Sequence, residues 1–157
     1  MDETTKAIVA KITVRYPAPV VLPEGRTGTV LYDCTRLSTP DLARVAAEAT
    51  GDLPEDTFDL VLGIAYRGIL FAAAVAGGRD VAILEREGGV CGPDLTGRRV
   101  VVVDDVVYSG ENLRRAAELV RQHGGSVVGF ACIVDRSDGA VGSTSCPLWS
   151  AFQPGEE

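Results

Sequence analysis

Residues 100–112 read VVVVDDVVYSGEN and join an apolar run, an acidic pair, a short turn and the start of a helical pattern. The run Val100–Val103 is β-branched at every position, which is typical of a strand buried on both faces of a parallel sheet. Beyond the turn, the spacing of one apolar helical stripe falls on Leu113, Ala116, Ala117 and Val120. The stretch therefore predicts a strand–turn–helix unit with Asp104 and Asp105 at the end of the strand.

This unit has the chemistry of a site for a sugar phosphate. Ligands of open parallel sheets bind outside the carboxyl ends of the strands, and the amino end of a helix attracts anions. A phosphate would be held there by loop amides and by the hydroxyl of Ser109. Asp104 and Asp105 would accept hydrogen bonds from sugar hydroxyls and favour positive charge at the anomeric carbon. The pattern indicates a binding site for a ribose 5-phosphate. The alternative without a function is an ordinary βα unit in which the acidic pair occurs by chance.

Length and charge limit the other classes of function. A chain of 157 residues predicts one domain, and a net charge of −7 argues against a nucleic-acid surface. No apolar run reaches the roughly 18 residues that a membrane crossing needs. Met1–Glu3 lacks the basic start of a signal peptide, so we expect a cytoplasmic protein with no membrane partner.

The cysteines do not predict a metal centre. Cys34, Cys91, Cys132 and Cys146 lie too far apart in sequence for zinc-ligand spacing, and His123 is the one histidine. Cys91 has no neighbouring base that would make it a nucleophile. Reduced thiols are the expected state.

The rest of the chain alternates between strand and helix patterns. Helices are expected over 4–14, 38–51 and 69–76, the last apolar all round and therefore buried, and the helix of the central unit ends at 123–125. Strands are expected over 20–22, 29–33, 58–64, 81–84, 100–103 and 127–134. Pro17, Pro19 and Pro23 predict breaks, residues 85–97 predict a loop, and residues 147–152 are expected to pack back against the body. This predicts an α/β fold, a parallel central sheet flanked by helices, with a hood over 1–37, a core over 38–140 and a tail over 141–157.

Polar or glycine-rich loops follow three of the expected strands, at 65–68, 104–112 and 135–136. Because the carboxyl ends of parallel strands meet at one edge of a sheet, we expect these loops to form one site.

The stretch 100–112 resembles the phosphoribosyl-pyrophosphate (PRPP) motif of type I phosphoribosyltransferases. No Gly-Lys-Ser/Thr follows the strand, which excludes a P-loop. The resemblance implies that Asp104 and Asp105 are catalytic, gripping the ribose. It implies that the 5-phosphate is bound by Val106, Val107, Tyr108, Ser109, Gly110, Glu111 and Asn112. It also implies Mg²⁺ on PRPP, with Asp104 and Asp105 as candidate ligands of the metal or its waters.

Three further stretches resemble the orotate branch of that family. Residues 63–69, GIAYRGI, are similar to its pyrophosphate loop, which implies a cis peptide between Ala65 and Tyr66. Residues 25–33 resemble its Gly-Arg and Tyr-x-Asp hairpin, and 134–139 its Asp-Arg-x-x-Gly, which implies that Arg136 binds the base. The pyrophosphate-binding residues are then Ala65, Tyr66, Arg67, Gly68 and Arg86. An orotate-like pyrimidine is the first expected acceptor, and a homodimer is implied.

The sequence departs from the orotate branch at several points. Tyr108 and Asn112 replace the usual hydroxyl residues of the motif, and Pro23 stands where a basic residue is usual. The long basic loop that closes over PRPP from a neighbouring subunit is reduced to residues 84–89, in which Arg86 is the one cation. Two alternatives therefore stay open: a non-catalytic PRPP or nucleotide sensor, and an enzyme that ribosylates an unusual acceptor.

Overall fold

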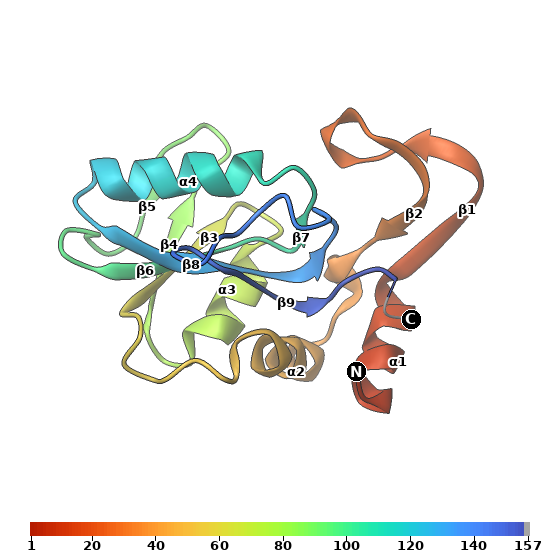
Figure 1. The fold of residues 1–157 in the computed structure, drawn as a ribbon, viewed down its shortest axis with the longest axis horizontal. Coiled ribbons are helices and arrows are strands. Elements are labelled where there is room, and N and C mark those ends of the chain that lie inside the picture. The colour runs from red at the N-terminus through yellow and green to blue at the C-terminus, as the bar shows by residue number, and fades with distance from the viewer. Residues whose placement is uncertain (156–157) are drawn as a thin grey trace.

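A computed structural model describes residues 1–155 and shows a mostly parallel sheet with helices on both faces (Figure 1). The helices are α1 (Glu3–Ile12), α2 (Thr39–Thr50), α3 (Ile69–Ala76) and α4 (Glu111–Gln122). The strands are β1 (Thr13–Val21), β2 (Thr27–Tyr32), β3 (Leu60–Ile64), β4 (Asp80–Leu84), β5 (Val90–Cys91), β6 (Arg99–Val103), β7 (Val106–Val107), β8 (Ser126–Asp135) and β9 (Leu148–Phe152). Residues 156 and 157, the last two of the predicted tail, lie outside the described residues.

The main sheet has the order β5-β4-β3-β6-β8-β7, with β9 also paired to β8. Strands β4, β3, β6 and β8 run parallel, and β5 returns antiparallel to β4. Val100–Val103 of β6 are buried, and successive side chains enter opposite cores. The α/β fold class predicted from this run is confirmed.

Each face of the sheet is covered by a different set of helices. One core contains residues of α1, α2 and α3, and the other is formed under α4 by Leu113, Ala116, Ala117 and Val120, the predicted stripe. In Figure 1, α4 lies on one side of the sheet and α2 and α3 on the other. These helices leave the carboxyl ends of the central strands accessible.

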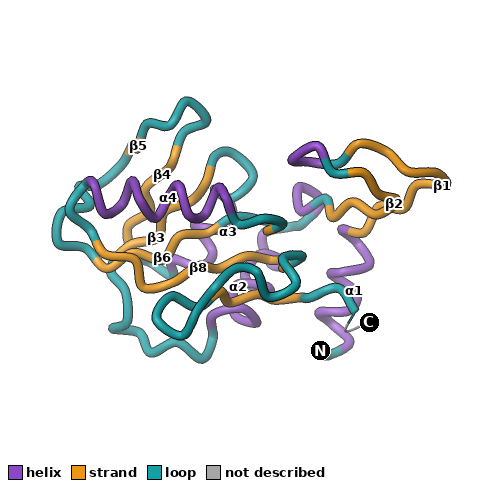
Figure 2. Tube along the Cα trace, turned by 45° about the horizontal axis from the view of Figure 1, so that its top comes forward, coloured by secondary structure: helices purple, strands orange, loops and turns teal. Residues whose placement is uncertain are grey.

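Within the hood predicted over 1–37, residues 13–32 form a ribbon beside this body, while α1 contributes to the same core as α2 and α3. Strands β1 and β2 make a separate antiparallel sheet, which extends from the body in both views (Figures 1 and 2). The predicted break at Pro17 and Pro19 was wrong, because β1 continues through both. An unpaired, irregular stretch between Arg15 and Val20 tolerates prolines, which cannot donate to a strand ladder.

Other expectations need correction at short elements. Residues 85–97 are not all loop, because Val90 and Cys91 form β5, and the turn after the acidic pair contains β7. Helix α3 has the predicted bounds but is not buried all round, since Leu70 is 64% exposed. The docking of residues 147–152 is confirmed by β9.

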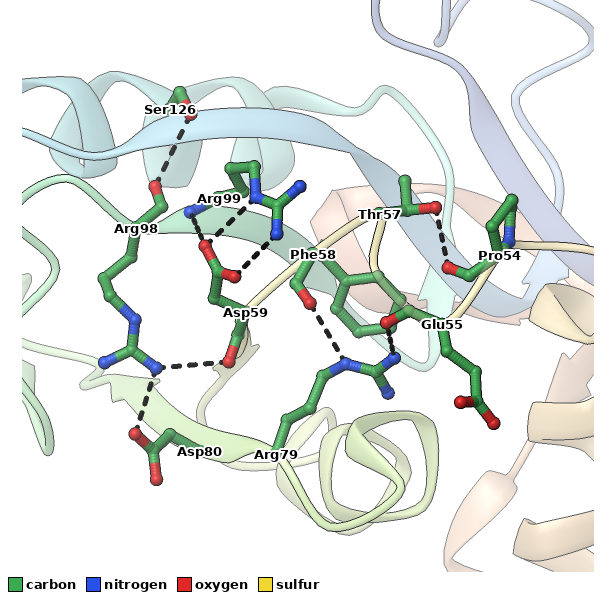
Figure 3. A network of polar contacts seen from close by, with 10 residues as sticks. All are labelled: Pro54, Glu55, Thr57, Phe58, Asp59, Arg79, Asp80, Arg98, Arg99 and Ser126. Atoms are coloured by element: carbon green, nitrogen blue, oxygen red, sulfur yellow. Dashed lines mark hydrogen bonds and ion pairs between the residues drawn. The ribbon is translucent and has the colours of Figure 1, made fainter.

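The amino ends of the strands are joined by a network of arginines (Figure 3). Arg99 donates to both carboxylate oxygens of Asp59, with Nη2–Oδ1 2.8 Å and Nε–Oδ2 3.2 Å. Arg98 Nη2 donates to Asp59 O (3.1 Å) and to Asp80 Oδ2 (3.0 Å). The side chains at this amino edge of the sheet thus hold the strands together. The polar loops lie at the opposite, carboxyl edge.

Across residues 1–155, none of the helices combines the length and the apolarity that a membrane crossing requires.

Candidate active site

The acidic pair is fixed by the backbone of the sheet at the end of β6. The carbonyl oxygen of Asp105 accepts hydrogen bonds from the amides of Ile133 and Val134 (2.9 and 3.1 Å). Asp104 Oδ1 accepts from Asp105 N (2.9 Å), and Asp105 Oδ1 accepts from Val106 N (2.8 Å). Both carboxylates are therefore held before any ligand arrives.

The environment of this pair disfavours negative charge. Burial, followed by the charge of Asp105, raises the pKa of Asp104 well above its usual range. Burial also raises the pKa of Asp105, and the hydrogen bond from Val106 N opposes that rise. A nearby cation relieves such a shift. The pair is thus suited to stabilise positive charge on a ligand.

The mouth of α4 opens beside the acidic pair. Gly110 precedes the helix in the left-handed conformation (φ 79°) and offers no side-chain cap. Ser109 Oγ accepts from Glu111 N (3.3 Å), and Arg114 Nη2 donates to Ser109 O (3.1 Å). Without a side-chain cap at Gly110, this helix end is suited to an anion.

Two arginines from different strand-end loops line the same site as the pair. The Ala65–Tyr66 peptide is cis, as the resemblance implies. The guanidinium carbons of Arg67 and Arg86 each lie 5.9 Å from the centre of the Tyr66 ring. Arg67 Nη1 is 3.9 Å from Asp33 Oδ1, so it is only loosely paired. These cations remain able to meet phosphate oxygens.

One cavity of about 380 Å³ joins these parts. The predicted residues that line it are Ala65, Tyr66, Arg67, Arg86, Asp104, Asp105, Val106, Tyr108 and Asn112. The predicted residues absent from its lining are Gly68, Val107, Ser109, Gly110, Glu111 and Arg136. Ser109 and Gly110 nonetheless flank it at the mouth of α4, and Gly68 N donates to Ile64 O (2.9 Å) to close the turn.

Arg136 lies under the hood rather than in the cavity lining. Its guanidinium carbon is 5.5 Å from the ring centre of Tyr32 and 5.7 Å from that of Tyr108. Arg26, on the hood, covers the Tyr108 ring at 5.0 Å. Tyr108 is thus placed between two cations, next to the acidic pair.

The loop after β4 is a tight hairpin, as its short sequence predicts. Glu85 N donates to Gly89 O (2.7 Å), Gly88 N donates to Glu85 O (2.9 Å), and β5 pairs back onto β4. Arg86 at its tip lines the cavity of its own chain.

The cavity lining also includes residues that were not predicted from the sequence, which are Glu24, Leu31, Tyr32, Ile64, Leu84, Glu85 and Arg115. Helical spacing could have found Arg115, because it lies three residues after Asn112 and donates to Asn112 Oδ1 (3.3 Å). Nothing in the local pattern indicates Glu24, which comes from the distant hood.

Comparison with known proteins supports this geometry. The model of the phosphoribosyl transferase domain family matches residues 89–148. Orotate phosphoribosyltransferase of Halorhodospira halophila is 43% identical over 127 residues, covering 71% of this chain and 55% of that protein. The chain thus spans little more than half the length of this relative. The enzyme of the same name from Caldanaerobacter subterraneus is 33% identical over 148 residues, covering 88% and 78%.

Among solved structures, orotate phosphoribosyltransferase of Mycobacterium tuberculosis in complex with PRPP superposes with a TM-score of 0.74 at 25% identity. The match covers 96% of this chain and 94% of that one. The similarity therefore extends over the hood, the sheet and the cavity together. On the strength of these matches, the chain belongs to the orotate phosphoribosyltransferase family.

Proposed function

We propose that the protein is a phosphoribosyltransferase that transfers the ribose 5-phosphate of Mg²⁺-PRPP to a pyrimidine base, with orotate as the first candidate, and releases pyrophosphate. The observation that carries this proposal is one cavity lined by Asp104, Asp105, Arg67 and Arg86 beside the open end of α4. The set contains groups for a sugar, a phosphate and a pyrophosphate. The relatives named above are enzymes of this activity, which supports a role in pyrimidine nucleotide synthesis.

The acidic pair would act on the ribose. Asp104 and Asp105 accept hydrogen bonds from its hydroxyls, and their charge stabilises the anomeric carbon as its bond to pyrophosphate breaks. The electron pair of that bond leaves with pyrophosphate. A ring nitrogen of the base forms the new bond with its lone pair, and the proton of that nitrogen passes to the released pyrophosphate. Since both carboxylates are positioned in advance by backbone amides, little reorganisation is needed.

The two phosphate-bearing ends of PRPP would be held by different elements. The amides at the mouth of α4 and the hydroxyl of Ser109 take the 5-phosphate. Arg67 and Arg86 neutralise pyrophosphate, because guanidinium groups match phosphate oxygens. Binding at both ends orients the reacting carbon above the acidic pair.

The residues present fit a magnesium ion that is shared with the substrate. Among residues 1–155 there is no cluster of three or more side chains suited to hold a metal alone. Asp104 and Asp105 offer carboxylate oxygens, which Mg²⁺ prefers, and PRPP supplies the others. When bound, the ion would neutralise charge on pyrophosphate, and the two aspartates would hold it or its waters.

The acceptor would lie between the acidic pair and the hood. Arg136, Tyr32 and Tyr108 offer a cation and two aromatic rings there. A guanidinium suits a carboxylated pyrimidine such as orotate. The homodimer and the cytoplasmic location stay predictions.

The short hairpin after β4 supports a second candidate, a protein that binds PRPP without turning it over. Pyrophosphate release from Mg²⁺-PRPP with orotate, uracil or purines decides between the two. We expect release with one pyrimidine, and Asp105→Asn should lower kcat by about 100-fold or more through loss of charge stabilisation. Glu87→Gln, a charge change on the exposed hairpin, is the control and should retain the rate. PRPP binding without release for every base would exclude the transferase.

A further inference from the structure

A carboxylate of the hood contacts the mouth of α4. Ser109 Oγ donates a hydrogen bond to Glu24 Oε2 (3.1 Å), although the two residues are 85 positions apart. Glu24 sits in the turn Pro23–Gly25 with φ 64° and ψ 23°, the left-handed region that non-glycine residues rarely adopt. The turn thus holds this side chain over the helix end in an unfavourable backbone conformation.

The contact uses the same proton that a phosphate would need. A serine hydroxyl has one hydrogen to donate. While Ser109 donates it to Glu24, it cannot donate it to an oxygen of a phosphate at the mouth of α4. The carboxylate therefore occupies a hydrogen-bonding position of the 5-phosphate.

The negative charge of Glu24 also opposes phosphate binding, in addition to its hydrogen bond with Ser109. Glu24 lines the cavity, and its charge is one of the causes, after burial and Asp105, that raise the pKa of Asp104. Because the charge of Glu24 acts on Asp104, it also repels a phosphate that enters the cavity between the two residues. Glu24 thus opposes a phosphate by occupying its partner and by its charge.

The rest of the hood is attached without using the phosphate position. Arg26 covers the Tyr108 ring, and Arg136 Nη1 donates to Val30 O (3.5 Å). The side chain of Glu24 is exposed and can turn into solvent. Its release therefore requires no detachment of β1 and β2.

We propose that Glu24 is a latch on the phosphate site, which accepts the hydrogen bond of Ser109 and must be displaced by the 5-phosphate of the substrate. This inference rests on the proposed function, because it assumes that the mouth of α4 binds a phosphate ester. The latch lowers the affinity of the site for every phosphate ester that enters.

Calorimetry with ribose 5-phosphate at fixed ionic strength tests the latch. Glu24→Ala, which removes both the acceptor and the charge, should tighten the dissociation constant by about tenfold, the size of a lost charge-assisted hydrogen bond. Glu24→Gln, which keeps a neutral acceptor of the same size, should tighten it by less. Glu87→Gln is the matched control: it removes an exposed carboxylate that lies outside the cavity lining and that Ser109 does not contact. It should change the constant by less than about twofold.

A double-mutant cycle separates the latch from general repulsion. In a Ser109→Ala background, Glu24→Ala should keep only the part of its effect that comes from charge, because the shared proton is gone. An effect of equal size with Glu87→Gln, an effect of Glu24→Ala that is undiminished in Ser109→Ala, or no binding of ribose 5-phosphate by any variant overturns the latch.

The outcome also separates this inference from the proposed function. Tighter ribose 5-phosphate binding in Glu24→Gln, without pyrophosphate release from PRPP by the unmutated protein, keeps the latch and rejects the transferase. Turnover with unchanged ribose 5-phosphate affinity rejects the latch alone.

Discussion

Gly110 is the residue at which the turn after the acidic pair becomes a helix, and its surroundings leave no room for a side chain. Its φ is 79°, and a Cβ at this position would lie 2.2 Å from Val141 Cγ2. The position thus combines a left-handed backbone with contact from the tail. The sequence indicates a glycine turn here, but the contact with Val141 depends on how the tail docks.

We expect Gly110→Ala to lower the free energy of unfolding by about 1–3 kcal/mol, because strain and overpacking add. It should also abolish ribose 5-phosphate binding, since the amides of the turn move. Chemical denaturation and calorimetry measure the two effects.

Gly97→Ala is the matched control for the backbone. Gly97 has φ 71°, and no atom lies within 4 Å of the position that a Cβ would take, so only the left-handed strain remains. That variant should lose about 1 kcal/mol and bind ribose 5-phosphate normally. Equal losses in the two variants would show that the contact with Val141 is unimportant.

At the scale of elements, long periodic segments were predictable and short ones were not. The bounds of α3 and the apolar stripe of α4 follow from local pattern. Strands β5 and β7 have two residues each, and they exist because β4 and β8 offer partners for pairing. A strand of that length leaves no periodicity in the sequence. Local pattern could not predict the proposed role of Glu24 either, because that role depends on a contact between the hood and the core that are distant in sequence.

The hairpin between β4 and β5 brings Arg86 to the cavity. Arg86→Ala should raise KM for PRPP by about tenfold, because a charge-assisted contact with pyrophosphate is lost. It should leave ribose 5-phosphate affinity unchanged, since that ligand lacks pyrophosphate. Steady-state kinetics and calorimetry give the two values.

Arg121→Ala removes a cation from the far end of α4 and serves as the control. A parallel loss of PRPP and ribose 5-phosphate affinity in Arg86→Ala would place Arg86 at the 5-phosphate instead.

At the scale of the whole molecule, the two edges of the sheet have separate tasks. The carboxyl edge carries the cavity, and the amino edge carries the arginine network of Figure 3. The side-chain hydrogen bond from Arg99 lowers the pKa of Asp59 to about 2, below the usual 3.8. A lowered pKa stabilises the fold above pH 3.8, and this stabilisation disappears as the pH falls toward 2.

Asp59→Asn should therefore lower Tm by a few degrees at neutral pH, and the difference should shrink as the pH falls through that window. Ribose 5-phosphate affinity should not change. Asp56→Asn, an equal change of charge in the same loop, is the control, because within residues 1–155 Asp56 acts on Arg99 through its charge and not through a hydrogen bond. A Tm difference independent of pH would contradict the assigned role of the ion pair.

The separate sheet of β1 and β2 has an evolutionary consequence. Because it shares no strand pairing with the main sheet, its residues can vary without disturbing the register of β3, β6 or β8. The main sheet, which carries the loops of the proposed phosphate site, and this ribbon, which would cover the base, are thus free to diverge at different rates. Exchange of this ribbon between relatives is a route by which one ancestral scaffold could acquire specificity for a new base.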